Sequence, residues 1–315
     1  MEIEKKHLLE EQMRVLYVSL TRAQRCLILS TKGNSNVVNE LSEFDDIKKL
    51  TKDNLKDLIY FGNPPEKRNT DLITLSYTSF DNYTKCSHLY NLMYNYHFIT
   101  PQNESMHIGS IAHDCLDAIN TYTADDDIDE DRVEEIIDTA IESNPNLKSN
   151  EKFQDVLDSV EEYYYDYIDD NVWKVLHSEY PFTISKMKNN VKYNITGKID
   201  LIIQEDEDND LKVSIVDYKT SADIENSRNF LDQLHIYAMS LEYNSEFEDK
   251  DIQNLIVYSL TDPSPETPYR FDVNRRNQLE EALYDTAKAI SHYKFSKTKD
   301  KSNCKFCPFR SLCKK

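Results

Sequence analysis

The chain has 315 residues, and 39% of them are hydrophobic, which is enough to build a sizeable core. Acidic residues outnumber basic ones by 57 to 37, giving a net charge of −20, and this excess argues against a basic surface spread over the whole molecule. It leaves room for a local basic groove, or for a carboxylate site that holds metal ions.

No apolar stretch is long enough to span a bilayer, and the charged first residues lack the apolar core of a signal peptide. We therefore expect a cytoplasmic protein without membrane contact. Thiols stay reduced in that compartment, so closely spaced members of the six cysteines are better candidates for metal or cluster binding than for disulfides.

The first part of the chain is predicted to end near residue 70. Residues 7–23 carry apolar side chains at helical spacing, and residues 25–31 are typical of a buried strand. Residues 32–70 are polar, with room for two short helices, and close with a segment rich in glycine and proline. The predicted parts are 1–31, a linker at 32–70, and a domain at 71–315.

The second part alternates helices with strands, which indicates an α/β fold with a mixed central sheet flanked by helices. The segments with helical patterns are 76–96, 105–122, 129–143, 151–170, 228–243 and 275–293. The segments with strand patterns are 178–187, 191–204, 211–220 and 254–260. The second and third of these strands are expected to form a hairpin across the acidic loop 205–210.

Two acidic residues interrupt the strands of this hairpin. Asp200 lies in "GKID" and Asp217 in "VDYKTS", where Lys219 shares the face of Asp217 because strand side chains alternate. An exposed Asp–Lys pair at a sheet edge would explain the second motif alone. Two carboxylates brought together repel each other unless a hard cation lies between them, so the pair of motifs predicts an Mg²⁺ site that acts on phosphate.

These motifs resemble the signature of PD-(D/E)XK nucleases, in the form found in RecB-type exonucleases. The resemblance implies a restriction-endonuclease-like core with Asp200, Asp217 and Lys219 as catalytic residues. Further segments resemble the same family: "IGSIAHDCLD", "FLDQLHIYAMSL" and "HSEYPF". They imply that His113 joins Asp200 and Asp217 as a metal ligand, that Gln233 and Tyr237 shape the site and contact DNA, and, on a loose alignment, that Glu179 is an additional acid.

Three cysteines, Cys304, Cys307 and Cys313, have the spacing C-x2-C-x5-C near the C-terminus. This spacing, with the distant Cys86, resembles the iron–sulfur subgroup of these nucleases, which includes AddB-type subunits and CRISPR-associated nucleases. The resemblance implies a [4Fe-4S] cluster that clips the N- and C-terminal segments of the domain together. Four thiolates also permit a structural zinc ion. Cys26 and Cys115 lie in apolar patterns typical of small core residues.

The segment "EEQMRVLYVSLTRAQRCLILS" resembles motif VI of UvrD/Rep-type superfamily 1 helicases, in which the residue matching Arg22 reaches ATP. The chain has no phosphate-binding glycine-rich loop, so we expect no ATPase or helicase activity from this chain alone. The resemblance implies a partner, either a separate helicase subunit or a missing N-terminal helicase portion.

Together these patterns predict an Mg²⁺- or Mn²⁺-dependent deoxyribonuclease, an exonuclease on single-stranded or end-processed DNA, working within a helicase–nuclease in DNA repair or recombination. The alternative is a non-catalytic DNA-binding or scaffold subunit that keeps the fold. The intact set Asp200, Asp217 and Lys219 favours the enzyme.

Overall fold

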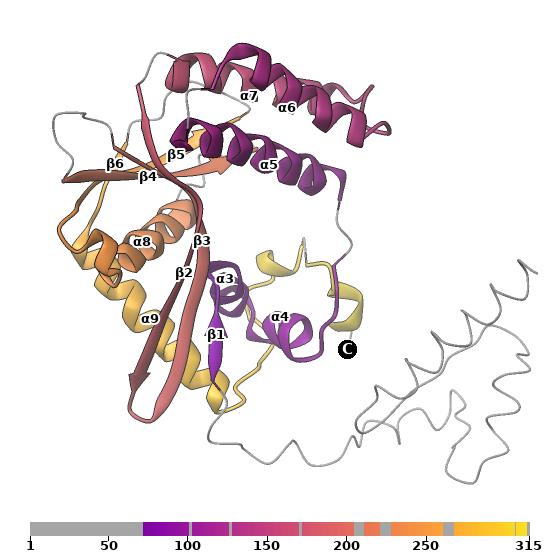
Figure 1. Cartoon of the computed structure of the whole chain (residues 1–315). Coiled ribbons are helices and arrows are strands. Elements are labelled where there is room, and N and C mark those ends of the chain that lie inside the picture. The colour runs from indigo at the N-terminus through magenta and orange to yellow at the C-terminus, as the bar shows by residue number, and fades with distance from the viewer. Residues whose placement is uncertain are drawn as a thin grey trace, which may run out of the picture. The chain divides into compact units, whose positions relative to one another are not determined.

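The structure, a computed structural model, describes residues 72–100, 103–125, 128–169, 172–204, 211–220, 228–260, 268–305 and 307–313 (Figure 1). The predictions for residues 1–70, among them the helix at 7–23, the strand at 25–31, Cys26 and Arg22, lie outside these described residues. The described residues all fall within one unit, Asn69–Lys315.

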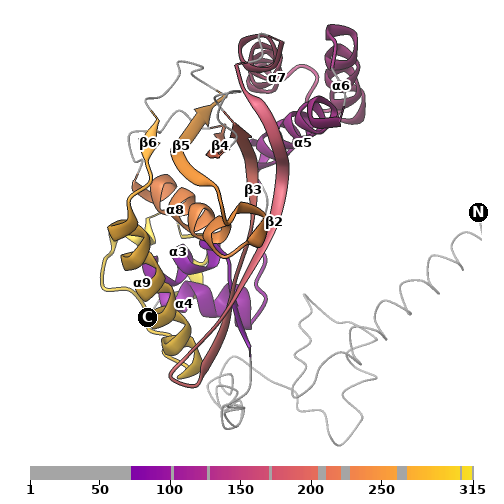
Figure 2. The same ribbon diagram turned by 60° about the vertical axis from the view of Figure 1, so that its left-hand side comes forward.

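A mixed sheet forms the centre of this unit, as the sequence predicts (Figures 1 and 2). Its strands are β1 (Ile73–Leu75), β2 (Lys174–Lys188), β3 (Val191–Gln204), β4 (Lys212–Lys219), β5 (Asp251–Ser259) and β6 (Tyr269–Arg270). The order β1-β3-β4-β5-β6 combines parallel β1–β3 and β4–β5 pairs with antiparallel β3–β4 and β5–β6 pairs. The short strands β1 and β6 have no counterpart in the predicted elements.

The long strand β3 organises the sheet. It pairs along its length with β2, which has no second partner and is therefore an edge strand that tolerates Pro181. On its other edge β3 pairs first with β1 and later with β4. Residues 196–200 of β3 lie between these two pairings, and the two motif carboxylates meet at this interruption.

One face of the sheet is covered by α5 (Glu104–Asp125), with α6 (Glu130–Ser143) and α7 (Glu151–Tyr163) outside it (Figure 1). The apolar residues of α5 recur every three or four positions and pack on β3, β4 and β5. Cys115 is one of them and is buried, as predicted. The α7 helix continues as a π-helical segment, Tyr164–Asp169.

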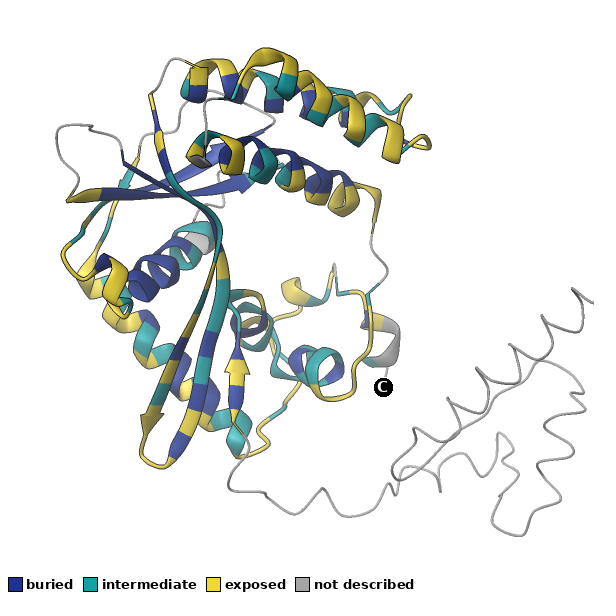
Figure 3. Ribbon diagram, in the orientation of Figure 1, coloured by how far each residue is buried: buried dark blue, intermediate teal, exposed yellow. Residues whose placement is uncertain are grey.

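The other face is covered by α8 (Arg228–Glu242), α9 (Val273–Ser291) and α3 (Tyr77–Lys85). Figure 3 shows that β4, most of β5 and the helix faces turned toward the sheet are buried, whereas most of the edge strand β2 is half-buried or exposed and the outer helix faces are largely exposed. None of the helices among the described residues has the length and apolarity needed to cross a membrane.

The predicted helix at 76–96 is broken at Cys86. The chain forms α3 and α4 (Ser87–Tyr90), followed by a π-helical turn, Asn91–Asn95. Cys86 between them has an extended backbone with φ −164° and ψ 106°, which no helix accommodates. The break presents the Cys86 side chain at a junction between helices. Short 3₁₀ turns at Ser245–Phe247, Ser302–Cys304 and Arg310–Cys313 complete the described elements.

Candidate metal centre

The β3–β4 hairpin brings the two motif acids together. Leu201 pairs with Val216, so the next residues along the two strands are Asp200 and Asp217. The strands separate at this point, because β3 turns to β1 while β4 continues beside β5. The backbone N–H of Tyr218 donates to Asp200 Oδ2 at 2.9 Å, so the Asp200 side chain takes the place of a strand partner.

Asp217 is fully buried and forms an ion pair with Lys219 from the same face of β4. Neither oxygen of Asp217 accepts a hydrogen bond of acceptable direction from the described residues. A buried carboxylate with two unsatisfied oxygens is costly unless something else binds it. The ammonium of Lys219 also lies 5.1 Å from the ring centre of Phe230 in α8, so protein surrounds much of this cation.

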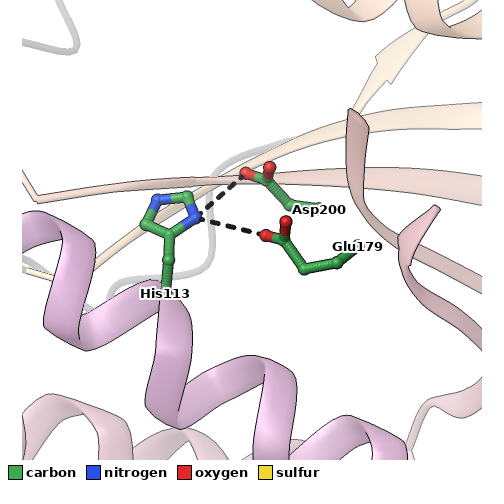
Figure 4. A group of neighbouring side chains, drawn as sticks. All are labelled: His113, Glu179 and Asp200. Atoms are coloured by element: carbon green, nitrogen blue, oxygen red, sulfur yellow. Dashed lines mark ion pairs between the residues drawn. The ribbon is translucent and has the colours of Figure 1, made fainter. Parts of the chain in front are cut away.

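His113 reaches the same place from α5 (Figure 4). Its Nδ1 lies 3.7 Å from Asp200 Oδ2 and 3.8 Å from Glu179 Oε1. Gly109, one turn earlier, allows this approach: a Cβ there would lie 2.9 Å from Thr220 Oγ1, just beyond Lys219. A side chain at this position would force Thr220 or the first turns of α5 to shift.

Glu179 in β2 lies opposite Asp200, between the pairs Ser178–Leu201 and Tyr180–Ile199. Its φ is 46°, in the left-handed region that few residues other than glycine adopt. Glu179 forms an ion pair with Lys198, which is also exposed to solvent. A strained backbone that directs a carboxyl group toward His113 is typical of a functional site.

The protonation of these groups is coupled by their closeness. Burial, and then the neighbouring Asp217, raise the pKa of Asp200 to about 7. Burial works against protonation of His113, but the carboxyl groups of Glu179, Asp200 and Asp217 outweigh it and raise the His113 pKa. The nearby His113, followed by Lys198, outweighs burial and lowers the pKa of Glu179. The group therefore carries more negative potential than its own cations neutralise.

These observations fit a divalent cation. Ligand atoms of His113, Glu179 and Asp200 all lie within 4.8 Å of one another. Asp217 adds two buried oxygens without a hydrogen-bond partner, one of which is ion-paired with Lys219. The fold thus brings the predicted ligands His113, Asp200 and Asp217 together. Glu179, which the sequence aligned only loosely with the family, also lies in this group. Oxygen-rich ligand sets of this kind suit Mg²⁺ or Mn²⁺.

A buried polar network supports the site from behind and was not predicted. Asn120 donates to the Tyr218 hydroxyl at 3.0 Å and accepts from the Tyr163 hydroxyl at 2.6 Å, and Tyr218 donates to Tyr163 at 3.0 Å. Asn120 lies two turns beyond His113 on α5, so the network fixes that helix against β4. The sequence contained one indication of this network: Asn120 is a polar residue on an otherwise apolar face of the predicted helix.

Gln233 and Tyr237 share one face of α8 as predicted, and the Gln233 amide donates to the Tyr237 hydroxyl at 2.6 Å. Burial, followed by the charges of Asp217 and Asp200, raises the pKa of Tyr237. The pair therefore lies within electrostatic reach of the carboxylates. Gly197 leaves room for the Phe182 ring that packs against Tyr237, because a Cβ at this position would lie 2.6 Å from that ring.

The four predicted cluster cysteines are free thiols at partly exposed positions. Burial above all, and also the neighbouring thiols of Cys313, Cys86 and Cys304, raise the pKa of Cys307, so the four sulfurs are neighbours although Cys86 is remote in sequence. Among the described residues, no three of these sulfurs lie within 4.8 Å of one another.

Comparisons with known proteins agree with these motifs. A family described as the PD-(D/E)XK nuclease superfamily matches residues 74–314. No curated protein matches the chain significantly. Two solved structures are similar to this chain at a low level: a protein from Eubacterium rectale provisionally described as an exonuclease, and the protein SSO0001. The first has 13% identity and a TM-score of 0.47, covering 85% of this chain and 96% of its own. The second has 13% identity and a TM-score of 0.37, covering 83% and 92%.

Proposed function

Because the chain belongs to the PD-(D/E)XK nuclease superfamily, we propose that it is a metal-dependent deoxyribonuclease that cleaves phosphodiester bonds by hydrolysis. The observation that carries the proposal is the crowded carboxylate group. Asp200 and Asp217 are both buried next to each other, and Lys219 and His113 lie beside them. This arrangement is costly by itself and becomes favourable when it binds a cation and an anionic substrate.

Asp200, Asp217, Glu179 and His113 would hold Mg²⁺ or Mn²⁺ in this proposal. The bound ion would lower the pKa of a water molecule and offset phosphate charge. Lys219, held against Asp217, would stabilise the negative charge that develops on the phosphate and orient the attacking water. Gln233 and Tyr237 would form the wall along which DNA lies.

The test is a cleavage assay on single-stranded, blunt and overhang DNA with Mg²⁺, Mn²⁺ or EDTA. We expect metal-dependent cleavage, with a preference for single strands or ends, and at least about a hundredfold loss in Asp217→Asn and Lys219→Gln. Glu281→Gln, which removes an exposed carboxylate outside the site, is the control. Wild-type rates in Asp217→Asn would refute the assignment. A folded chain that binds DNA and cleaves none of the substrates would favour a scaffold role.

The four cysteines are proposed to hold a [4Fe-4S] cluster. A tetrahedral zinc ion with Zn–S bonds of about 2.3 Å brings its sulfurs to about 3.8 Å from one another. The spacing C-x2-C-x5-C of Cys304, Cys307 and Cys313, with the distant Cys86, is the reason to propose the larger cluster. All four thiolates are occupied in such a cluster, so its role would be structural and separate from the carboxylate site.

The wider setting is also a proposal. The motif VI resemblance around Arg22 is the reason to expect a helicase partner, either a separate subunit or a longer form of the chain, in DNA repair or recombination in the cytoplasm. Measuring DNA-stimulated ATPase activity of the chain alone tests one part of this. We expect none, and turnover that is lost in Arg22→Ala would contradict that expectation.

A further inference from the structure

The basic side chains of this acidic protein are unevenly paired. Many cations of the described unit each form an ion pair with a carboxylate, among them Lys85, Lys186, Lys188, Lys198, Arg275 and Arg276. Residues 294–313 differ: they carry six cations and a single carboxylate, Asp300. The six are Lys294, Lys297, Lys299, Lys301, Lys305 and Arg310, and all are exposed. None forms an ion pair with another described residue.

Exposed aromatic and apolar side chains lie next to this basic segment. Tyr96 is 64% exposed, Phe98 45% and Ile99 88%. Phe98 packs against Phe309 with ring centres 5.9 Å apart, which joins the run 96–99 to the basic segment. Figures 1 and 2 show the C-terminal segment, drawn in yellow, beside α3 and α4. Cations interleaved with exposed rings are typical of surfaces that bind single-stranded nucleic acid.

The run 96–99 also leads toward the carboxylate site. It precedes α5, which begins at Glu104 and carries His113 nine residues later. Nine residues of helix rise by about 13 Å. A stacked strand spans that distance in about four nucleotides, at 3.4 Å for each phosphate. The helical part of the path toward His113 therefore corresponds to few nucleotides.

We propose that residues 96–99, 294–305 and 307–310, here called the strand-binding surface, bind single-stranded DNA, with bases stacked on Tyr96 and Phe98 and phosphates on Lys305, Arg310 and neighbouring lysines. This inference rests on the proposed function and adds to it a second contact region for the same substrate. A net charge of −20 repels a polyanion over most of the molecule. On the strand-binding surface, by contrast, cations outnumber carboxylates. The surface therefore attracts the strand and guides it toward the carboxylates.

The charge half of the proposal is tested by binding of a fluorescein-labelled oligothymidylate to the full chain, prepared without oxygen and kept in EDTA. Lys305→Gln/Arg310→Gln should lower the slope of log affinity against log salt by about 1.4, because each phosphate contact on a single strand contributes about 0.7. Lys174→Gln/Lys212→Gln removes two exposed charges elsewhere and should leave the slope unchanged. Equal slopes in both variants, as expected if the surface instead serves an acidic protein, would overturn the proposal. Iron content and melting temperature show whether each variant is intact.

The proposed stacking of bases is tested at Tyr96, because Tyr96 is more exposed than Phe98, which packs against Phe309. Tyr96→Ala should bind the oligothymidylate about tenfold more weakly and a duplex as tightly as before, since only unpaired bases stack. Tyr96→Trp should restore binding. An equal loss for the single strand and the duplex, or no loss for either, would overturn the stacking role.

Adding Mg²⁺ or Mn²⁺ to the same samples separates the two proposals. A chain that shows the expected binding losses and never cleaves would refute the proposed function alone. A chain that cleaves, while its variants bind the oligothymidylate like wild type, would refute the strand-binding surface alone.

Discussion

Asp200 is buried beside a second carboxyl group, so its charge is opposed both by the loss of water and by Asp217. Its pKa of about 7 means that the metal-free fold binds a proton at this position that the unfolded chain releases near pH 4. The contribution of Asp200 to the stability of the metal-free protein is therefore greatest below the unfolded pKa and falls as pH rises toward 7. A bound cation removes that penalty, which couples metal affinity to pH.

We expect Mn²⁺ affinity to fall by up to about tenfold for each pH unit below about pH 7 and to level off above it, because the metal must displace the Asp200 proton. His113, whose pKa is also raised, steepens this dependence. Calorimetry between about pH 6 and pH 8 measures it, and the heat in buffers of different ionisation enthalpy reports the released proton. Affinity that does not change across this range would contradict the expectation.

The left-handed backbone of Glu179 lowers the stability of the fold, but it places a carboxyl group at the candidate metal site. A glycine relaxes a φ of 46°, so Glu179→Gly should keep or raise the free energy of unfolding, by up to about 1 kcal/mol. The same change removes the Glu179 carboxyl group that lies beside His113, and it should lower metal affinity and cleavage at least about tenfold. Denaturant unfolding of the metal-free protein and a cleavage assay measure the two effects. Glu179→Ala is the matched control, because it removes the carboxyl group and keeps the strain. A large stability loss in the glycine variant would contradict this account.

At the level of elements, the close approach of α5 to the end of β4 sets the position of His113. Gly109→Ala should favour the helix by about 1 kcal/mol and yet displace it, because the new methyl group meets Thr220 Oγ1. A shift of a few tenths of an ångström at the site is expected to lower cleavage about tenfold. Thr220→Ala alone should cleave nearly normally, and Gly109→Ala/Thr220→Ala should recover most of the lost rate. A double variant no better than Gly109→Ala would show that the contact with Thr220 does not matter.

The hairpin and its two acids follow from local sequence. Alternating apolar residues fix the face of each strand, and the acidic loop 205–210 fixes which strands pair, so the closeness of Asp200 and Asp217 follows from the strand pattern. The position of Glu179 does not follow in this way, because its left-handed backbone depends on packing around it. The Gly109–Thr220 contact and the break at Cys86 also arise between segments distant in sequence. Local patterns do not contain that information.

Across the whole described unit, the two ends are held together at the cysteines. The Tyr83 hydroxyl donates to the Lys294 carbonyl at 2.7 Å, the Ser87 hydroxyl to the Ser296 carbonyl at 3.0 Å, and the Asn303 amide to the Lys85 carbonyl at 3.0 Å. Asn303 and Lys85 are 218 positions apart. Closing a loop of that length costs about 5 kcal/mol of chain entropy. The partly exposed hydrogen bonds contribute about 1 kcal/mol each, and the stacking of Phe295 on Tyr90, with ring centres 6.1 Å apart, adds packing at the same junction.

A cluster bound by four thiolates would add stabilisation at this junction. Cys86→Ala should therefore yield a chain without iron or sulfide that melts at least about 5 °C lower, since a domain of this size has a total stability of about 5–15 kcal/mol. Cys115→Ala also removes one thiol, but from the buried face of α5, and should keep its iron while losing little stability. Metal analysis and thermal unfolding of anaerobically purified protein measure both. Zinc in place of iron, or a Cys86→Ala variant that keeps its iron and its melting temperature, would show that the ends are joined by packing and hydrogen bonds rather than by a cluster.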